Sequence, residues 1–164
     1  MSSLLSFPNP VNEKAARVVA GTVLVAAIVI LATGAYWLLI PIAYGFWARA
    51  LTGPTLSPLG RLAQRVIAPH LGPAKPVPGP PKRFAQAIGT VISTAALVFG
   101  LILGHHAVAD DLLILLAVAT GLESIFAICL GCHIFALLMR AGLVPDEVCA
   151  ECTDISLQLR TADR

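Results

Sequence analysis

Long stretches without charged residues limit what this chain can fold into. Val18–Ala48 runs for 31 residues without a charge, and Phe84–Gly104 runs for 21. Leu112–Met139 carries a single acidic residue, Glu123, among its 28 residues. The whole chain is only 12% charged, about half the share of a soluble domain. Because a helix of about 20 apolar residues crosses a hydrocarbon core, the sequence predicts an all-α, polytopic membrane protein.

The first stretch is too long for a single span, because 31 helical residues would reach about 46 Å against a core of about 30 Å. Its middle reads Thr33-Gly34-Ala35-Tyr36-Trp37. Small residues there favour a turn, and the two aromatic side chains suit a membrane interface. We therefore expect a short helical hairpin. The chain then has four transmembrane helices, at about residues 17–33, 36–51, 84–104 and 112–139.

Residues 52–83 form the connection between the second and third spans. Ser57-Pro58 is typical of a helix start, with a capping hydroxyl followed by proline in the first turn. Four apolar residues then share one helical face: Leu59, Leu62, Val66 and Ile67. This pattern predicts a short helix lying on the membrane surface, although a loop helix packed on its own protein fits equally well. Pro69–Pro81 contains six prolines and is expected to be an extended, non-helical spacer.

The basic residues sort to one side of this arrangement. With four spans, all 11 lysines and arginines lie before the first span, between the second and third, or after the fourth. By the positive-inside rule, both termini, the proline-rich connection 52–83 and the tail 142–164 are cytoplasmic. The sequence has no basic stripe with interleaved aromatic residues, which argues against nucleic-acid binding. The lipid bilayer is the partner that the sequence itself indicates.

All four cysteines stand in two C-x-x-C pairs near the C-terminus, Cys129–Cys132 and Cys149–Cys152. In a continuous fourth helix, the i, i+3 spacing would put the first two sulfurs on one face near its cytoplasmic end. The segment from the expected helix end at Ala141 to Cys149 spans up to roughly 26 Å when extended. That is long enough for the chain to fold back, so all four sulfurs can meet at the inner membrane surface.

Two chemistries suit this arrangement, and the sequence leaves both open. Two C-x-x-C pairs can pass electrons by thiol–disulfide exchange. Four thiolates can instead bind zinc tetrahedrally, with His133 as a substitute ligand. Acidic residues around the second pair favour a bound cation over a free thiolate. A cytoplasmic position disfavours permanent disulfides, and buried, unreactive cysteines are the third interpretation.

Glu123 is the other candidate for chemistry. We expect it near the middle of the bilayer, with no basic residue at its depth, where it would act as a proton relay. The plainer alternative is a protonated side chain bonded to Ser93 or Thr94 of the third span. For His133, the plainer alternative is a hydrogen bond to a helix carbonyl. Four residues in the expected outer turn resemble a small metal cluster, but we expect them to be solvated: His105, His106, Asp110 and Asp111.

Three parts of the sequence are distinctive: Phe7–Asn12, Pro81–Ala85, and the C-x-G-C and V-C-x-x-C motifs of the two cysteine pairs. In these parts the chain resembles a bacterial integral membrane-protein family of unknown function with four predicted spans. The resemblance covers nearly the whole chain, and it implies the same topology and a place in the bacterial inner (plasma) membrane. It implies no settled activity. Four-helix thiol-redox families such as the vitamin K epoxide reductases are similar in architecture alone.

We therefore expect a tetra-cysteine centre at the cytoplasmic face that acts in thiol–disulfide redox or sulfur handling. Cys129 and Cys132 would be the membrane-proximal pair. Cys149 and Cys152 would be the mobile pair, which meets a soluble cytoplasmic thiol or sulfur-carrier protein. The alternative is a non-enzymatic scaffold or accessory subunit whose cysteines hold a structural zinc. Either protein could belong to a larger membrane complex or a homo-oligomer.

Overall fold

The computed structural model describes residues 7–145 and residue 148, which are mostly helical. The helices are α1 (Glu13–Thr33), α2 (Leu39–Thr52), α3 (Pro58–Leu62), α4 (Ala68–His70), α5 (Gly79–Leu97), α6 (His106–Phe126) and α7 (Leu130–Arg140). Three tighter or wider helical turns adjoin them, at Tyr36–Leu38, Ala63–Ile67 and Val98–Ile102. Two short antiparallel strands complete the described chain, β1 (Val11–Asn12) and β2 (Pro76–Val77). The helical fold class expected from the sequence is confirmed.

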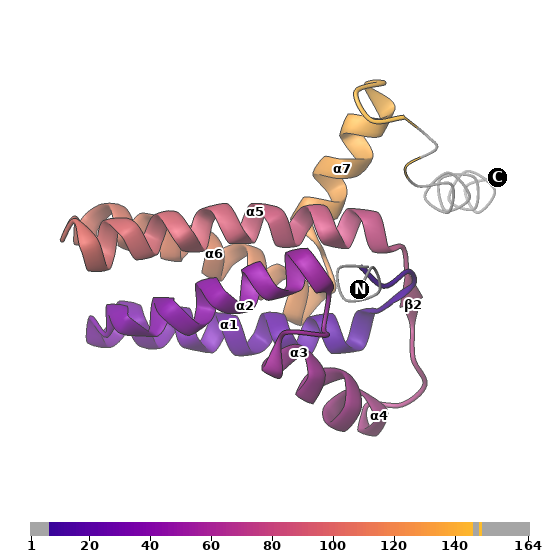
Figure 1. Ribbon diagram of the computed structural model, residues 1–164, viewed down its shortest axis with the longest axis horizontal. Helices are drawn as coiled ribbons and strands as arrows, with labels where there is room; N and C mark the ends of the chain where they lie inside the picture. The colour runs from indigo at the N-terminus through magenta and orange to yellow at the C-terminus, as the bar shows by residue number, and fades with distance from the viewer. Residues whose placement is uncertain (1–6, 146–147, 149–164) are drawn as a thin grey trace.

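Four helices form an elongated bundle, α1, α2, α5 and α6, in which successive helices run in opposite directions (Figure 1). Within it, α1 packs on α6, α2 packs on α5, and α5 packs on α6. The short helices α3 and α4 lie at one end, with α3 and α4 both in contact with α1. Helix α7 projects from this same end, away from the bundle axis. The short helices and α7 are thus gathered at one end of the bundle, and within residues 7–145 the opposite end carries only the turns between the bundle helices.

Apolar side chains cover both the inside and the outside of the bundle. The core consists of aliphatic, small and aromatic residues: Val23, Ala27, Ile30, Leu39, Ile42, Phe46, Ala96, Leu113 and Leu116. Each bundle helix also exposes large apolar side chains, among them Ile28, Trp47, Val91 and Ile114. A helix that is apolar all round is typical of a membrane span or of the core of a large protein. The outer surface of this bundle is therefore suited to lipid.

Two helical segments, Glu13–Thr33 and Gly79–Ile102, are long and apolar enough to cross a membrane. Helices α6 and α7 supply a third candidate if they are treated as one broken span. Helix α2, with 14 residues, reaches only about 21 Å. On length and composition the described residues thus provide two or three spans, rather than the four expected from the sequence.

The turn expected inside the first apolar stretch is present. Helix α1 ends at Thr33, and the N–H of Gly34 donates to the Ile30 carbonyl at 2.7 Å. Gly34 has a φ of 70°, a left-handed conformation that favours glycine at a helix end. Tyr36 and Trp37 follow directly in the short turn before α2. The break between the first two helices is therefore where the sequence predicted it.

The helix expected from Ser57 onward is also present, but it buries a different face. The Ser57 hydroxyl accepts the N–H of Gly60 at 3.1 Å and so caps α3 as predicted. Of the apolar face proposed from the sequence, Leu62 and Val66 are exposed. Small residues form the face that packs against α1: Ala63 and Ala68. Their size lets the two helices approach closely. Of the predicted apolar face, Leu59 is partly buried and packs on this cluster, while Leu62 and Val66 stay on the outside.

Helix α5 begins at Gly79, five residues before the predicted start at Phe84. Pro80 and Pro81 occupy its first turn, where a residue without an N–H loses no helical hydrogen bond. The expectation of a non-helical spacer over Pro69–Pro81 is therefore wrong at both ends, because Pro69 and His70 belong to α4 and Gly79–Pro81 to α5. Lys82 is therefore a helical residue, and its side chain has a defined direction that a loop residue would lack.

The predicted fourth span, residues 112–139, is not one helix. Helix α6 ends at Phe126 and α7 leaves it at an angle of 93°. Ala127 takes a φ of 60°, and the N–H of Ile128 donates back to the Leu122 carbonyl at 3.1 Å. Residues 127–129, where the helix breaks, include neither glycine nor proline. The sequence therefore carries no local signal of the break, and the apolar run predicted a continuous helix.

Candidate functional site

Cys129 and Cys132 lie at the N-terminus of α7. Cys129 is the capping residue, and its Sγ accepts the N–H of Cys132 at 3.4 Å. Both residues are free thiols, Cys129 buried and Cys132 partly exposed. The expectation of a pair near the C-terminal end of a long helix is wrong, because the helix breaks just before Cys129. A helix N-terminus stabilises a thiolate through its free N–H groups and its dipole.

Gly131, between the two cysteines, lets α7 contact the start of α5. A Cβ atom on Gly131 would lie 2.6 Å from the Cα of Ala85, which is closer than such atoms pack. Further along α7, Phe135 packs on Phe84 of α5 with ring centroids 5.6 Å apart. The glycine of the C-x-G-C motif thus holds both sulfurs beside the first turns of α5.

Lys82 and Glu123 form a buried ion pair next to the corner at which α7 turns away from α6. The Lys82 Nζ lies 2.5 Å from the Glu123 Oε1, and the side chains are 9% and 14% exposed. Lys82 comes from the first turn of α5 and Glu123 from the last turn of α6. The expectation that no basic residue lies near Glu123 is therefore wrong. The plainer alternative, a protonated side chain bonded to Ser93 or Thr94, is wrong as well, because Glu123 bonds to Lys82. The carboxylate stands near the end of its helix, where the basic residues gather.

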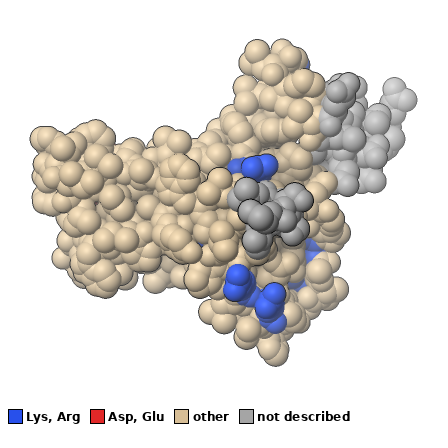
Figure 2. Space-filling view, in the orientation of Figure 1, with Lys and Arg blue, Asp and Glu red and all other residues tan. Residues whose placement is uncertain are grey.

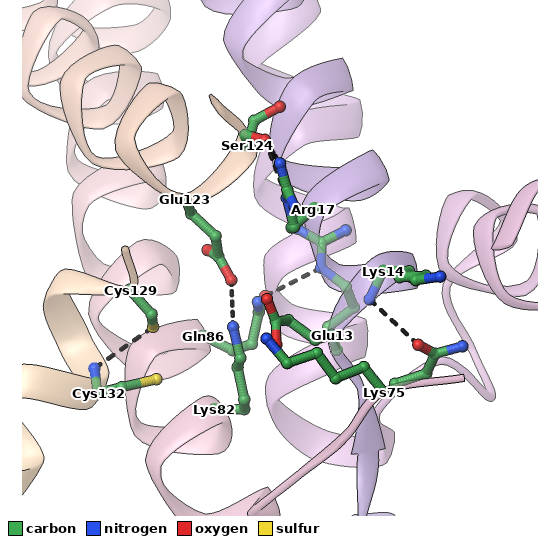
Figure 3. A network of polar contacts seen from close by, with 12 residues as sticks. Glu13, Lys14, Arg17, Lys75, Lys82, Gln86, Glu123, Ser124, Cys129 and Cys132 are labelled. Atoms are coloured by element: carbon green, nitrogen blue, oxygen red, sulfur yellow. Dashed lines mark hydrogen bonds and ion pairs between the residues drawn. The ribbon is translucent and has the colours of Figure 1, made fainter. Parts of the chain in front are cut away.

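The ion pair and the two thiols share one small space (Figure 3). The ammonium group of Lys82 interacts electrostatically with the sulfurs of Cys129 and Cys132 as well as with Glu123. A nearby cation favours a thiolate, while a nearby carboxylate opposes it. Lys82 therefore has two possible negatively charged neighbours, the Glu123 carboxylate and a cysteine thiolate. Its charge favours the thiolate, and the carboxylate weakens that effect.

Arg17 of α1 stabilises the end of α6. Its Nε and Nη2 donate to the Ser124 carbonyl at 3.1 and 2.9 Å, and Nη2 also donates to the Ile125 carbonyl at 3.1 Å. The last carbonyls of a helix have no partner within the helix, so a guanidinium there satisfies them. Arg17 thereby helps to fix the corner from which Cys129 and Glu123 project (Figure 3).

The basic residues concentrate at this end of the bundle. In Figure 2 the lysine and arginine atoms that are visible lie around α3 and the base of α7, and the remaining length of the bundle shows none in this view. At the same end, Glu13 pairs with Lys75 at 2.8 Å, and the Lys14 Nζ donates to the Leu71 carbonyl at 2.7 Å. The cysteine pair therefore lies at the basic end.

The histidines do not join the sulfurs. The Nδ1 of His133 lies 2.9 Å from the Cys129 backbone carbonyl. At the opposite end, helix α6 already begins at His106, whose ring stacks on Tyr36 with centroids 4.4 Å apart. The Tyr36 hydroxyl donates to Asp110 at 2.8 Å. The outer residues His105, His106 and Asp111 are exposed, as expected. Asp110 is partly buried and bonded to Tyr36, so the expectation of a solvated residue is wrong for Asp110.

Within the described residues, no group of three or more histidine, cysteine, aspartate or glutamate side chains is placed to hold a metal ion. A four-sulfur site would need Cys149 and Cys152, which lie outside the described residues. Sequence reasoning missed the contributions of Lys82 and Arg17. The signal for Lys82 was present in the two prolines before it, which mark the first turn of a helix and so give the lysine a defined direction.

A family model described as "Domain of unknown function (DUF4395)" matches residues 11–140 of the chain. The match covers most of the sequence, and the chain therefore belongs to this family. It includes Cys129, Cys132, Lys82 and Glu123, and it ends before the second cysteine pair. The expectation of an uncharacterised family is confirmed. No curated protein and no solved structure matches the chain.

Proposed function

We propose that this protein is an integral protein of the bacterial inner membrane that performs thiol–disulfide exchange at Cys129 and Cys132. One observation supports this most directly. The Cys129 sulfur caps α7 through the N–H of Cys132 at 3.4 Å, with the Lys82 ammonium close by. Helix N-termini and neighbouring cations are the two features that typically activate a C-x-x-C pair.

In the proposed orientation, the four bundle helices cross the bilayer and the basic end faces the cytoplasm. The alternating helix directions and the outward apolar side chains support this arrangement. Helix α2 completes a span together with the turn Tyr36–Leu38 that precedes it. Because α7 turns by 93° from α6, it would then lie along the inner membrane surface. Both termini would be cytoplasmic by the positive-inside rule.

The two sulfurs have different roles in the exchange. Cys132 is the more accessible of the pair, so an incoming thiolate would attack its sulfur in the oxidised, disulfide-bonded form. Cys129 would leave as a thiolate, which the helix N-terminus and Lys82 stabilise. A thiol that is more easily deprotonated leaves faster in such reactions, so the asymmetry of the pair matches the direction of attack.

The reaction balances with a dithiol as the electron donor. Attack on Cys132 forms a mixed disulfide and breaks the bond between Cys129 and Cys132. The second thiolate of the donor then attacks the donor's own sulfur, which closes the donor disulfide and releases Cys132 as a thiolate. The two thiolates of the pair finally take up the two protons that the donor lost. The donor would be the pair Cys149 and Cys152, or a soluble cytoplasmic protein with a dithiol of its own.

The test is a thiol titration of the detergent-purified chain, with metal analysis of the same sample. We expect no stoichiometric zinc, and a Cys129–Cys132 disulfide that forms and is reduced reversibly in glutathione redox buffers. Cys129→Ser should trap a mixed disulfide on Cys132, resolved by mass spectrometry of its peptide. One zinc per chain, with no reversible disulfide, would instead establish the scaffold alternative and overturn the exchange.

A further inference from the structure

A partly open cavity of about 70 Å³ lies beside the ion pair, between α1, α2, α3 and α5. A water molecule needs roughly 10–15 Å³ by this measure, so the cavity has room for a small polar group of several atoms. Its walls combine apolar residues with five residues whose side chains carry hydrogen-bond donors: Asn12, Arg49, Gln64, Lys82 and Gln86. No acidic side chain is among its described lining residues.

Arg49 of α2 is the central residue of this cavity. It is only 6% exposed, and its guanidinium lies over the ring of Phe46 at 4.7 Å. Its Nε donates to the Gln86 Oε1 at 2.9 Å, and its Nη1 reaches the Ser57 hydroxyl at 3.5 Å. Its Nη2 is buried and has no hydrogen-bond partner in the described part of the chain.

The buried charges at this place do not cancel. Arg49 and Lys82 bring two cations, and Glu123 pairs directly with Lys82. Among the described residues, Arg49 has no ion pair of its own. A buried cation with an unsatisfied donor is costly unless an anion compensates it.

We propose that this cavity binds an oxyanion, a phosphate or sulfate group, with Arg49 as its principal ligand. The free Nη2 of Arg49 would donate to one oxygen, and the Lys82 ammonium and the Gln86 amide N–H groups would donate to others. Guanidinium groups are suited to oxyanions because their donors lie in one plane and keep their charge. The anion would supply the negative charge that the site lacks.

Two sources carry this chemistry: free inorganic oxyanions and the headgroup of an anionic phospholipid. The site shares Lys82 with the proposed thiol exchange, but neither cysteine is among its described lining residues, and anion binding is measured without any thiol reaction. Failure of one proposal therefore leaves the other intact.

The experiment titrates the full chain, purified in maltoside micelles free of phospholipid, with sodium phosphate and sodium sulfate by calorimetry, with sodium chloride as the ionic-strength control. We expect one saturable site per chain. Arg49→Gln should weaken binding at least about tenfold, the value of one lost hydrogen bond to a charged group. The matched control is Arg65→Gln, an exposed arginine in the turn between α3 and α4, which should bind as the wild type does.

A second variant leaves every charge in place. Ala16→Leu would fill the cavity, which Ala16 lines, and should abolish binding. Ala32→Leu, at an exposed position on the same helix, should not. If circular dichroism shows that Arg49→Gln does not fold, the comparison of Ala16→Leu with Ala32→Leu still tests the proposal.

Adding phosphatidylglycerol to the micelles separates the two sources. If the headgroup occupies the site, the lipid stays bound to the wild type, but not to Ala16→Leu, in native mass spectrometry, and it weakens phosphate binding by competition. If free ions are the ligand, phosphate binding does not change. Either outcome supports the oxyanion site. The proposal is overturned if phosphate, sulfate and lipid all fail to bind saturably, or if Ala16→Leu binds them as tightly as Ala32→Leu.

Discussion

Lys82 and Glu123 meet at 2.5 Å although 41 positions separate them in the sequence. The contact joins the first turn of α5 to the last turn of α6, and both side chains are largely buried. Buried pairs of this kind contribute little net stability compared with apolar packing, but the loss of one partner leaves an unpaired buried charge. The pair therefore fixes how α5 and α6 meet at the end of the bundle that holds the thiols.

Removing the positive partner should destabilise the fold strongly. Lys82→Met keeps the length of the side chain but leaves the Glu123 carboxylate buried and unpaired, so we expect a loss of about 3–5 kcal/mol in unfolding free energy. Denaturant unfolding in micelles measures it. Lys75→Met is the matched control, because Lys75 is 65% exposed in its pair with Glu13 and should lose at most about 1 kcal/mol. Equal losses for the two variants would contradict a buried pair.

Removing the negative partner should instead activate Cys129. Glu123→Gln takes away a carboxylate that opposes thiolate formation and leaves the Lys82 charge to the sulfurs. We expect iodoacetamide to modify Cys129 about three- to tenfold faster at neutral pH, as followed by peptide mass spectrometry. Glu13→Gln, whose carboxylate pairs with Lys75, serves as the control with an unchanged rate. A slower reaction of Glu123→Gln would indicate that Glu123 acts as a base toward the thiol.

The glycine of the C-x-G-C motif should be sensitive to one added methyl group. Gly131→Ala forces α7 away from Ala85, and overpacking of this kind costs about 1–3 kcal/mol. Gly121→Ala is the control, because the added Cβ would meet only Leu24 at 3.7 Å; it should be neutral or stabilising. Thermal unfolding measures both. The double variant with Ala85→Gly should recover only part of the loss, because it removes the Ala85 Cβ but leaves the Cα 2.6 Å from the added methyl group. A loss for Gly131→Ala no larger than for Gly121→Ala would rule out this contact as the cause.

Two substitutions of Cys129 should separate its structural role from its chemistry. Serine is a good helix cap and alanine is a poor one, so Cys129→Ala should cost about 0.5–2 kcal/mol more than Cys129→Ser. Hydrogen exchange at the first amides of α7 should show the same order. Both variants should be equally unable to form the disulfide. If serine and alanine are equally stable, the cysteine does not act as a cap.

Local signals in the sequence predicted several of these features correctly. Gly34 marked the end of α1 because the chain there needs a left-handed residue, and Ser57 marked the start of α3 through its capping hydroxyl. The sorting of basic residues to one end followed from their positions in the sequence. Each of these features depends on neighbours within a few positions, which a sequence displays directly.

The corner that creates the candidate site depends on distant residues. Ala127 adopts a left-handed conformation without the glycine that usually signals it, while Arg17, over 100 positions away, binds the carbonyls of Ser124 and Ile125. The partner of Glu123 was hidden for a similar reason, because Lys82 was placed in a loop. Tertiary contacts, rather than local preference, determine the geometry in both places.

The position of Lys82 links two chemical events that would otherwise be separate. Lys82 pairs with Glu123, lies in the same small space as the two cysteines and lines the cavity beside Arg49. A thiolate on Cys129 and an oxyanion in that cavity would compete for the same positive charge. By reciprocity of coupled equilibria, oxidation of the thiol pair would tighten anion binding, and a bound anion would in turn make the pair harder to reduce. Lys82 would then couple the reduction of the thiol pair to the binding of an anion in the cavity.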